Sequence, residues 1–186
     1  MILSLLHFPV IRREALVQSA LALAFALMIG VGAHVRVTLP FTPVPVTFQT
    51  LFLLIGASYL RRSFSLQMVG WYLLLGAMGL PLFASSSSNG WILLSGPTGG
   101  YLFGFILSAW VLGYLQGRSA WQQLLLYVAA HTVLFVPGLL WLRWTMHLDW
   151  PRTIVMGFTP FIVGDILKSS IAFSTWFFFP KHRGFE

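Results

Sequence analysis

Six apolar segments, each separated from the next by a short polar or proline-rich stretch, constrain this chain more than any other feature. Their approximate bounds are Glu14–Ala33, Thr47–Leu60, Ser63–Gly79, Gly99–Gly117, Trp121–Leu142 and Ile154–Phe179. Apolar runs of roughly 20 residues cross a bilayer as helices, which satisfy their backbone polar groups internally. Only 8% of the 186 residues are charged, whereas a soluble domain has about a quarter. The sequence therefore predicts one all-α integral membrane domain over residues 1–186, with six transmembrane helices.

The distribution of basic residues predicts the orientation of this domain. With the N-terminus inside, cytoplasmic segments carry seven Lys or Arg residues and outer loops carry three; the seven are Arg12, Arg13, Arg61, Arg62, Arg118, Lys181 and Arg183. Because cytoplasmic loops are enriched in Lys and Arg, both termini are expected in the cytoplasm. The first segment also resembles a signal peptide, but it is longer than a typical signal core and five more segments follow, which favours a retained helix.

Asp165 and Lys168 lie inside the last apolar segment, three residues apart. At this spacing two side chains share one face of a helix. A charge near the bilayer centre costs about 3 kcal/mol on insertion scales. Both side chains are therefore expected to face the protein interior, either as a binding site for a polar ligand or as a buried structural ion pair.

Two unusual loops fall on the outer side in this topology, above the end of a cleft that leads to Asp165. They are His34–Val46, which is rich in proline, and Pro81–Pro97, which contains the serine run Ser85–Ser88. Proline fixes φ and stiffens a segment, so the first loop predicts a semi-rigid lid and the second an adaptable one. The alternatives are a plain connector, for which thirteen residues is long, and a flexible serine linker.

The sequence contains few residues or motifs that are typical of a catalytic site. Of the five histidines only His131 lies well within a span, where a lone histidine is expected to be a hydrogen-bonded packing residue. The chain has no cysteine and only four acidic residues, and it contains no H-E-x-x-H, G-x-S-x-G or Walker motif. We therefore expect no catalytic residues, no metal site, no cofactor and no enzymatic activity. The net charge of +7 is spread over span ends, which argues against nucleic-acid binding.

Small residues repeat every four positions on two of the predicted helices. Ala22, Ala26 and Gly30 form one such row on the first helix, and Ala20 and Ala24 form a neighbouring row. Gly100 and Gly104 begin a similar row on the fourth helix. Such rows let helix backbones approach closely, usually within one chain. The first-helix rows are the better candidates for docking a separate subunit.

Four strings, in order, resemble the BioY family of biotin-binding S-components of energy-coupling factor (ECF) transporters. They are TLPFTPVPVTFQTLFLLIGA, YLLLGAMGLPLFA, GPTGGYLFGF and GDILK. The resemblance implies an S-component-like fold and ATP-driven biotin uptake through the cytoplasmic (inner) membrane of a prokaryote. It also implies partner subunits, namely one transmembrane coupling subunit and two ATPase subunits. Docking to them would use the first-helix row, for which the candidates are Ala20, Ala22, Ala24 and Ala26.

The resemblance also assigns the binding residues. It implies that Asp165 and Lys168 bind biotin and that the loop before the fourth helix adds polar contacts, for which Asn89 is the candidate, although the serine run departs from the family's glycine-rich pattern. Biotin's apolar ring and chain suit a cleft with aromatic walls. The remaining candidates for substrate binding are Gln49, Trp91 and Tyr101.

A second function class stays open at this point. A self-sufficient secondary transporter of biotin or a similar solute would use Asp165 and Lys168 as a proton-coupled pair. The sequence shows no evident inverted repeat or paired broken helices, which argues against this alternative. Dependence of uptake on ATP and on partner subunits separates the two classes.

Overall fold

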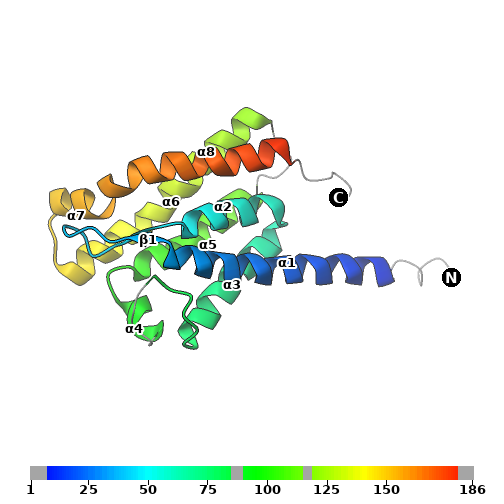
Figure 1. Cartoon of the computed structure of the whole chain (residues 1–186), viewed down its shortest axis with the longest axis horizontal. Helices are drawn as coiled ribbons and strands as arrows, with labels where there is room; N and C mark the ends of the chain where they lie inside the picture. The colour runs from blue at the N-terminus through cyan, green and yellow to red at the C-terminus, as the bar shows by residue number, and fades with distance from the viewer. Residues whose placement is uncertain (1–7, 85–89, 115–118, 180–186) are drawn as a thin grey trace.

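The computed structural model describes residues 8–84, 90–114 and 119–179, and they form a mostly helical fold (Figure 1). Its helices are α1 (Phe8–His34), α2 (Gln49–Tyr59), α3 (Arg62–Ala77), α4 (Gly90–Ser95), α5 (Gly99–Tyr114), α6 (Ala120–Met146), α7 (Trp150–Gly157), the 3-10 helix η1 (Thr159–Phe161) and α8 (Ile162–Phe178). Two short antiparallel strands, β1 (Arg36–Val37) and β2 (Val46–Thr47), join α1 to α2. Helix thus occurs within all six predicted segments.

Three helical stretches among the described residues are long and apolar enough to cross a membrane. They are Arg13–His34, Ala120–Met146 and Trp150–Phe178. The helices α2, α3 and α5 have 11, 16 and 16 residues. Sixteen residues rise only about 24 Å, less than the ~30 Å of a typical hydrocarbon core. A membrane domain of several helices is therefore supported, whereas the count of six spans stays a prediction.

The sixth predicted span is not one continuous helix, which corrects the sequence interpretation. Residues 150–178 form α7, η1 and α8, and the helix is interrupted at Phe158, where φ is −127° and ψ is −54°. Pro160 explains the interruption, because proline has no N–H and its ring clashes with the carbonyl four residues earlier. The break places Asp165 in the first turn of α8. The positive end of the helix dipole lies there and favours a negative charge.

Local capping signals explain where other helices begin and end. Ser119 and Gln122 form a capping box at the start of α6, which satisfies two backbone donors. His147, with a left-handed φ of 51°, ends the same helix. The Asp149 carboxylate accepts a hydrogen bond of 3.0 Å from the Arg152 backbone and caps α7.

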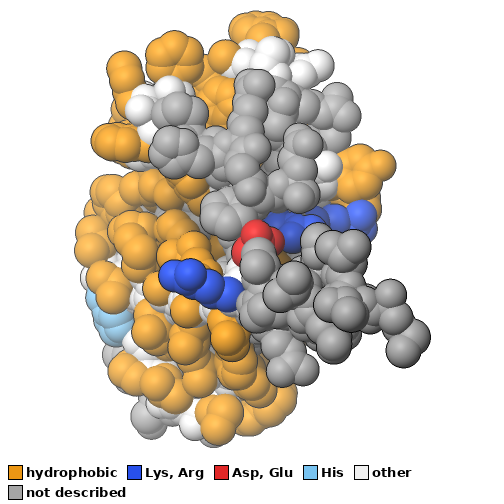
Figure 2. All heavy atoms as spheres, turned by 90° about the vertical axis from the view of Figure 1, so that its right-hand side faces the viewer, with side chains coloured by type: hydrophobic (Ala, Val, Ile, Leu, Met, Phe, Trp, Pro, Cys, Tyr) orange, Lys and Arg blue, Asp and Glu red, His pale blue; other side chains and the backbone are white. Residues whose placement is uncertain are grey.

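The helices form one bundle with two distinct ends. The helix α5 packs against α6, α1 packs against α2 and α3, and α8 packs against α2 and α6. The first residues of α1 and the last of α8 lie at one end, and β1, α4 and α7 lie at the other (Figure 1). Viewed from the end that holds the start of α1, charged side chains lie near the middle and hydrophobic ones cover most of the left-hand side (Figure 2).

Aromatic side chains mark two levels along the bundle. The Arg62 guanidinium lies 4.9 Å from the Trp110 ring centre and 5.2 Å from that of Tyr114, and Arg143 lies 4.7 Å from Trp150. Trp and Tyr gather where membranes meet water. Arg62 begins α3 and Arg143 lies near the end of α6, so the two clusters are consistent with the two interfaces of a bilayer.

Glycines bring α5 and α6 into backbone contact. A Cβ added at Gly104 would lie 2.4 Å from the Leu134 carbonyl oxygen, and one at Gly100 would lie 2.4 Å from that of Pro137. These distances are shorter than any van der Waals contact, so neither position has room for a side chain. The close packing predicted for this glycine row is confirmed.

This contact predicts a difference between two glycine-to-alanine substitutions. Gly104→Ala should destabilise the protein by about 1–3 kcal/mol, because overpacking pushes α5 away from α6. Gly70→Ala in α3 is the control, since nothing lies within 4 Å of its added Cβ and alanine favours helix by about 1 kcal/mol. Thermal unfolding in detergent should show a lower midpoint only for Gly104→Ala, and equal midpoints would contradict the close contact.

Candidate functional site

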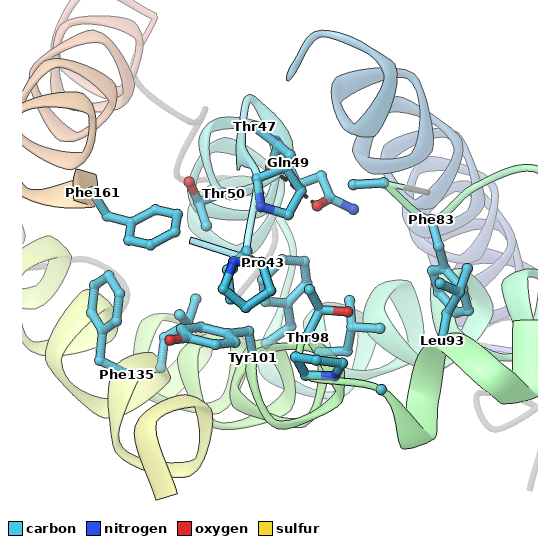
Figure 3. A pocket seen from close by; sticks show the side chains of 18 of the residues that line it. Pro43, Thr47, Gln49, Thr50, Phe83, Leu93, Thr98, Tyr101, Phe135 and Phe161 are labelled. Atoms are coloured by element: carbon cyan, nitrogen blue, oxygen red, sulfur yellow. Dashed lines mark hydrogen bonds between the residues drawn. The ribbon is translucent and has the colours of Figure 1, made fainter. Parts of the chain in front are cut away.

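A cavity of about 320 Å³ lies between α2, α5, α6 and α8 at the end of the bundle that holds the loops. Aromatic and aliphatic side chains form most of its wall (Figure 3). Phe135 and Phe161 lie on one side of the space, and Phe83 and Leu93 lie on the other (Figure 3). The polar side chains that line it include Thr47, Gln49, Thr50, Thr98, Asp165 and Lys168. Such a cavity suits a small, mainly apolar ligand with a polar group.

Asp165 and Lys168 form the charged part of the cavity wall. Their exposed fractions are 8% and 5%, which confirms the predicted interior orientation. Asp165 Oδ1 lies 2.5 Å from Lys168 Nζ. The ammonium also donates to Thr50 Oγ1 at 2.7 Å and to the Thr47 carbonyl at 3.3 Å. The pair on α8 is therefore tied to the start of α2.

Gln49 and Tyr101 also line the cavity, and each is held by hydrogen bonds. The Gln49 side-chain amide donates to the Tyr72 hydroxyl, and its carbonyl oxygen accepts from Thr47 Oγ1 at 3.1 Å. The Tyr101 hydroxyl donates to the Gly157 carbonyl at 2.8 Å. The Tyr101 ring lies 6.0 Å from Phe135, nearly perpendicular to it. Both side chains are thus fixed in place before any ligand arrives, which lowers the entropic cost of binding.

Sequence reasoning did not place His131 beside the charged pair. It was expected to be a hydrogen-bonded packing residue, and it is buried and hydrogen-bonded. Its Nε2 also lies 3.6 Å from Asp165 Oδ1. Its Nδ1 lies 3.2 Å from the Tyr127 carbonyl and 3.1 Å from the Ser169 hydroxyl. The contact between His131 and Asp165 depends on how α6 packs against α8. Periodicity along the chain therefore does not predict it.

The remaining predicted site residues lie elsewhere. Trp91 is 69% exposed and is not part of the cavity wall, although Leu93 of the same short helix is. Asn89 lies outside the described residues. Among the residues that the structure describes, no group of three or more His, Cys, Asp or Glu could hold a metal ion. The structure brings together four of the predicted residues, which are Gln49, Tyr101, Asp165 and Lys168.

Both predicted lid loops contribute to the cavity wall. Pro43, Val44 and Pro45 come from the first loop, and Phe83 and Pro97 lie near the two ends of the second. The strands β1 and β2 pair the ends of the first loop. The loops are also joined, because His34 Nε2 donates to the Pro81 carbonyl at 2.6 Å. The expected position of the loops over the cleft is confirmed, and their closing over a ligand stays a prediction.

Ala22 and Ala26 do not form a docking surface, which corrects one assignment. Both are fully buried in the chain's own core, on the side of α1 that packs against α2 and α3. Their small side chains let these helices approach, as the usual role of such rows within one chain requires. Ala20 and Ala24 are exposed, so docking through this second row stays a prediction.

Comparison with known proteins gives consistent matches. The family model described as the BioY family matches residues 9–181. A curated relative, "Biotin transporter BioY" of Thermotoga maritima, is 40% identical over 151 residues, which are 80% of this chain and 86% of the relative. "Probable biotin transporter BioY" of Methanothermobacter thermautotrophicus is 41% identical over 83 residues, 38% of this chain and 52% of the relative.

A solved structure has the same fold. It is a crystal structure of the S-component for biotin from an ECF-type ABC transporter, and it matches with a TM-score of 0.78. The alignment covers 87% of this chain and 89% of that one, with 17% sequence identity. At this identity the match shows the fold alone, namely that of an ECF S-component.

Proposed function

The chain belongs to the BioY family, and we propose that it captures biotin as the substrate-binding membrane subunit of an ATP-driven vitamin transporter. The observation that carries the proposal is the cavity of about 320 Å³, which joins a buried Asp165–Lys168 pair to aromatic walls. The names of the curated relatives and the fold shared with a biotin S-component support the choice of ligand.

The chemistry of biotin fits this cavity. Its ureido group has two N–H donors and one carbonyl acceptor, which match a carboxylate and an ammonium. Its thiophane ring and valeryl chain match apolar walls such as Tyr101, Phe135 and Phe161. We assign Asp165 to accept from a ureido N–H and Lys168 to donate to a biotin oxygen. An analogue without the ureido group leaves buried polar groups unpaired, which costs about 1–3 kcal/mol for each.

The orientation that we propose has both termini in the cytoplasm. The first residues of α1 and the last of α8 lie at the same end of the bundle (Figure 1), as an even number of crossings requires. Seven Lys or Arg residues of the sequence fall in the predicted cytoplasmic segments and only Arg36, Arg143 and Arg152 in the predicted outer ones, a bias that favours this orientation. The loop end, with the cavity, then faces outside, and the chain spans the cytoplasmic membrane of a prokaryote six times.

Energy for transport must come from other subunits in this proposal. The sequence contains no Walker motif, so we propose a transmembrane coupling subunit and two ATPase subunits as partners, and transport without catalysis by this chain. Uptake of labelled biotin by cells with and without the partner subunits tests this point. Uptake that persists without ATP and without partners would instead favour a proton-coupled secondary transporter.

Substitutions of the charged pair test the binding site. Asp165→Asn and Lys168→Met should each weaken biotin binding at least tenfold, about 1.4 kcal/mol, because each removes one charged partner of the ligand. Isothermal titration calorimetry on detergent-purified protein measures this affinity. Asp149→Asn is the control, since asparagine caps a helix as well as aspartate does. Unchanged affinity in both site variants would make the pair purely structural.

Thiol labelling tests the closing of the first loop. The chain has no cysteine, so Thr42→Cys provides a single site beside Pro43 and Val44, which line the cavity. An impermeant thiol reagent added outside should label it more slowly when biotin is present, because ligand binding favours the closed state. Arg152→Cys, on exposed α7 at the same end, should react equally with and without biotin.

Two outcomes of this experiment would contradict the proposal. Equal labelling of Thr42→Cys with and without biotin would show that the loop does not close over the ligand. Labelling only from the cytoplasmic side would reverse the orientation.

Docking to the coupling subunit is tested with the two alanine rows of α1. Ala24→Leu, on the exposed row, should abolish transport in the assembled complex while biotin binding by the isolated subunit stays intact. Ala22→Leu, on the buried row, should lower the unfolding temperature, since it overpacks the core. Normal transport by a folded Ala24→Leu variant would exclude this row as the docking surface.

A further inference from the structure

We infer that His131 is a positioning residue that holds the Asp165 carboxylate in place from the side opposite the ligand. The part of this inference that concerns biotin affinity rests on the proposed function, and the contact between His131 and Asp165 does not. His131 belongs to α6 and Asp165 to α8, so the contact also fixes how these helices meet beside the cavity.

The surroundings of His131 leave the carboxylate as the partner for its Nε2. The side chain is 8% exposed, and within the described residues Nε2 has no hydrogen-bond partner. Asp165 Oδ1 lies 3.6 Å away, which is longer than a hydrogen bond but close enough for an electrostatic contact. An unpaired buried donor is costly, so a small movement that shortens this distance is favourable.

The contacts of the other ring nitrogen select the tautomer. A proton on Nδ1 would be donated to the Tyr127 carbonyl, and the Nε2 lone pair would then face the carboxylate and repel it. With the proton on Nε2, the Ser169 hydroxyl donates to Nδ1 at 3.1 Å and the Nε2–H points toward Asp165. The second arrangement pairs both ring nitrogens with side chains and gives up the contact between Nδ1 and the Tyr127 carbonyl, 3.2 Å away. Because it avoids repulsion next to a buried carboxylate, we take the ring to be a donor to Asp165.

This arrangement extends the ion pair into a chain of polar groups. It runs from Ser169 through His131, Asp165 and Lys168 to Thr50, and links α8, α6 and α2. Within the described residues, the contacts from His131 and Lys168 both fall on Oδ1. The other carboxylate oxygen is the one that we assign to a ligand N–H in the cavity.

A second cavity shows what lies behind His131. It has a volume of about 600 Å³, runs between α6, α7 and α8, and shares Asp165 and Phe135 with the first cavity. His131 lines the second cavity and is not part of the wall of the first. The walls around it include the exposed aliphatic residues Val128, Val136, Ile162 and Ile166. In such apolar surroundings an electrostatic contact is weakly screened. The imidazole therefore stabilises the position of the Asp165 carboxylate more than it would in water.

Two substitutions of His131 separate positioning from packing. Glutamine places an amide N–H near the position of the imidazole Nε2, whereas leucine fills similar space without a donor. His131→Leu should weaken biotin binding about tenfold, and His131→Gln should keep most of the wild-type affinity. Calorimetry measures the affinity, and thermal unfolding checks that both variants fold.

Two further measurements make the test specific to Asp165. The effect of His131→Leu on affinity should largely vanish in an Asp165→Asn background, because the interaction partner is gone. Independently of any ligand, the infrared difference spectrum of wild type minus Asp165→Asn isolates the Asp165 carboxylate band. That band should shift in His131→Leu and stay in place in His131→Gln.

The outcomes distinguish this inference from the proposed function. Failure of the wild type to bind biotin would overturn the proposed function, and the infrared measurement would still decide the role of His131. An unshifted carboxylate band in His131→Leu would overturn the inference. Equal loss of affinity in the leucine and glutamine variants, together with lower unfolding temperatures, would make His131 a packing residue and overturn it as well.

Discussion

The site depends on the cost of burying two charges. Removing an ion from water costs several kcal/mol even when a partner charge is present, so the Asp165–Lys168 pair needs further polar contacts. Thr50 supplies one from the start of α2, the Thr47 carbonyl supplies one from β2, just before that helix, and His131 supplies one from α6. Because these groups come from three elements, satisfying the charges also fixes how α2, α6 and α8 meet around the cavity.

The interruption of the last helix also helps to stabilise the buried Asp165 carboxylate. The sequence predicted one helix over Ile154–Phe179 because its apolar composition outweighed a single proline. Pro160 instead starts a new helix at Ile162 and puts Asp165 in the first turn of α8. A carboxylate in that turn lies at the positive end of the helix dipole, which stabilises it. The sequence contained the signal in Pro160, and its effect on the position of Asp165 needed the structure.

Sequence reasoning succeeded where geometry is local. The three-residue spacing of Asp165 and Lys168 determines their shared helix face. Apolar composition locates six segments that each contain helix, whereas α4 lies in a predicted loop. His131 lies 34 residues before Asp165, and only the packing of α6 on α8 brings them together. Ala20 and Ala22, two residues apart, lie about 200° apart around a helix. The sequence shows two rows of small residues on the first helix. Tertiary contacts decide which of the two rows faces the core.

The net charge of the site indicates which part of biotin contacts the Asp165–Lys168 pair. Asp165 and Lys168 neutralise each other, so a ligand that binds against them should add no net charge to a buried site. The neutral ureido group meets this requirement. A carboxylate placed against Lys168 would leave one negative charge in excess among apolar walls, which is costly. We therefore infer that the ureido group lies against the pair and the carboxylate toward the loop end, where Thr98 and the first loop border the cavity.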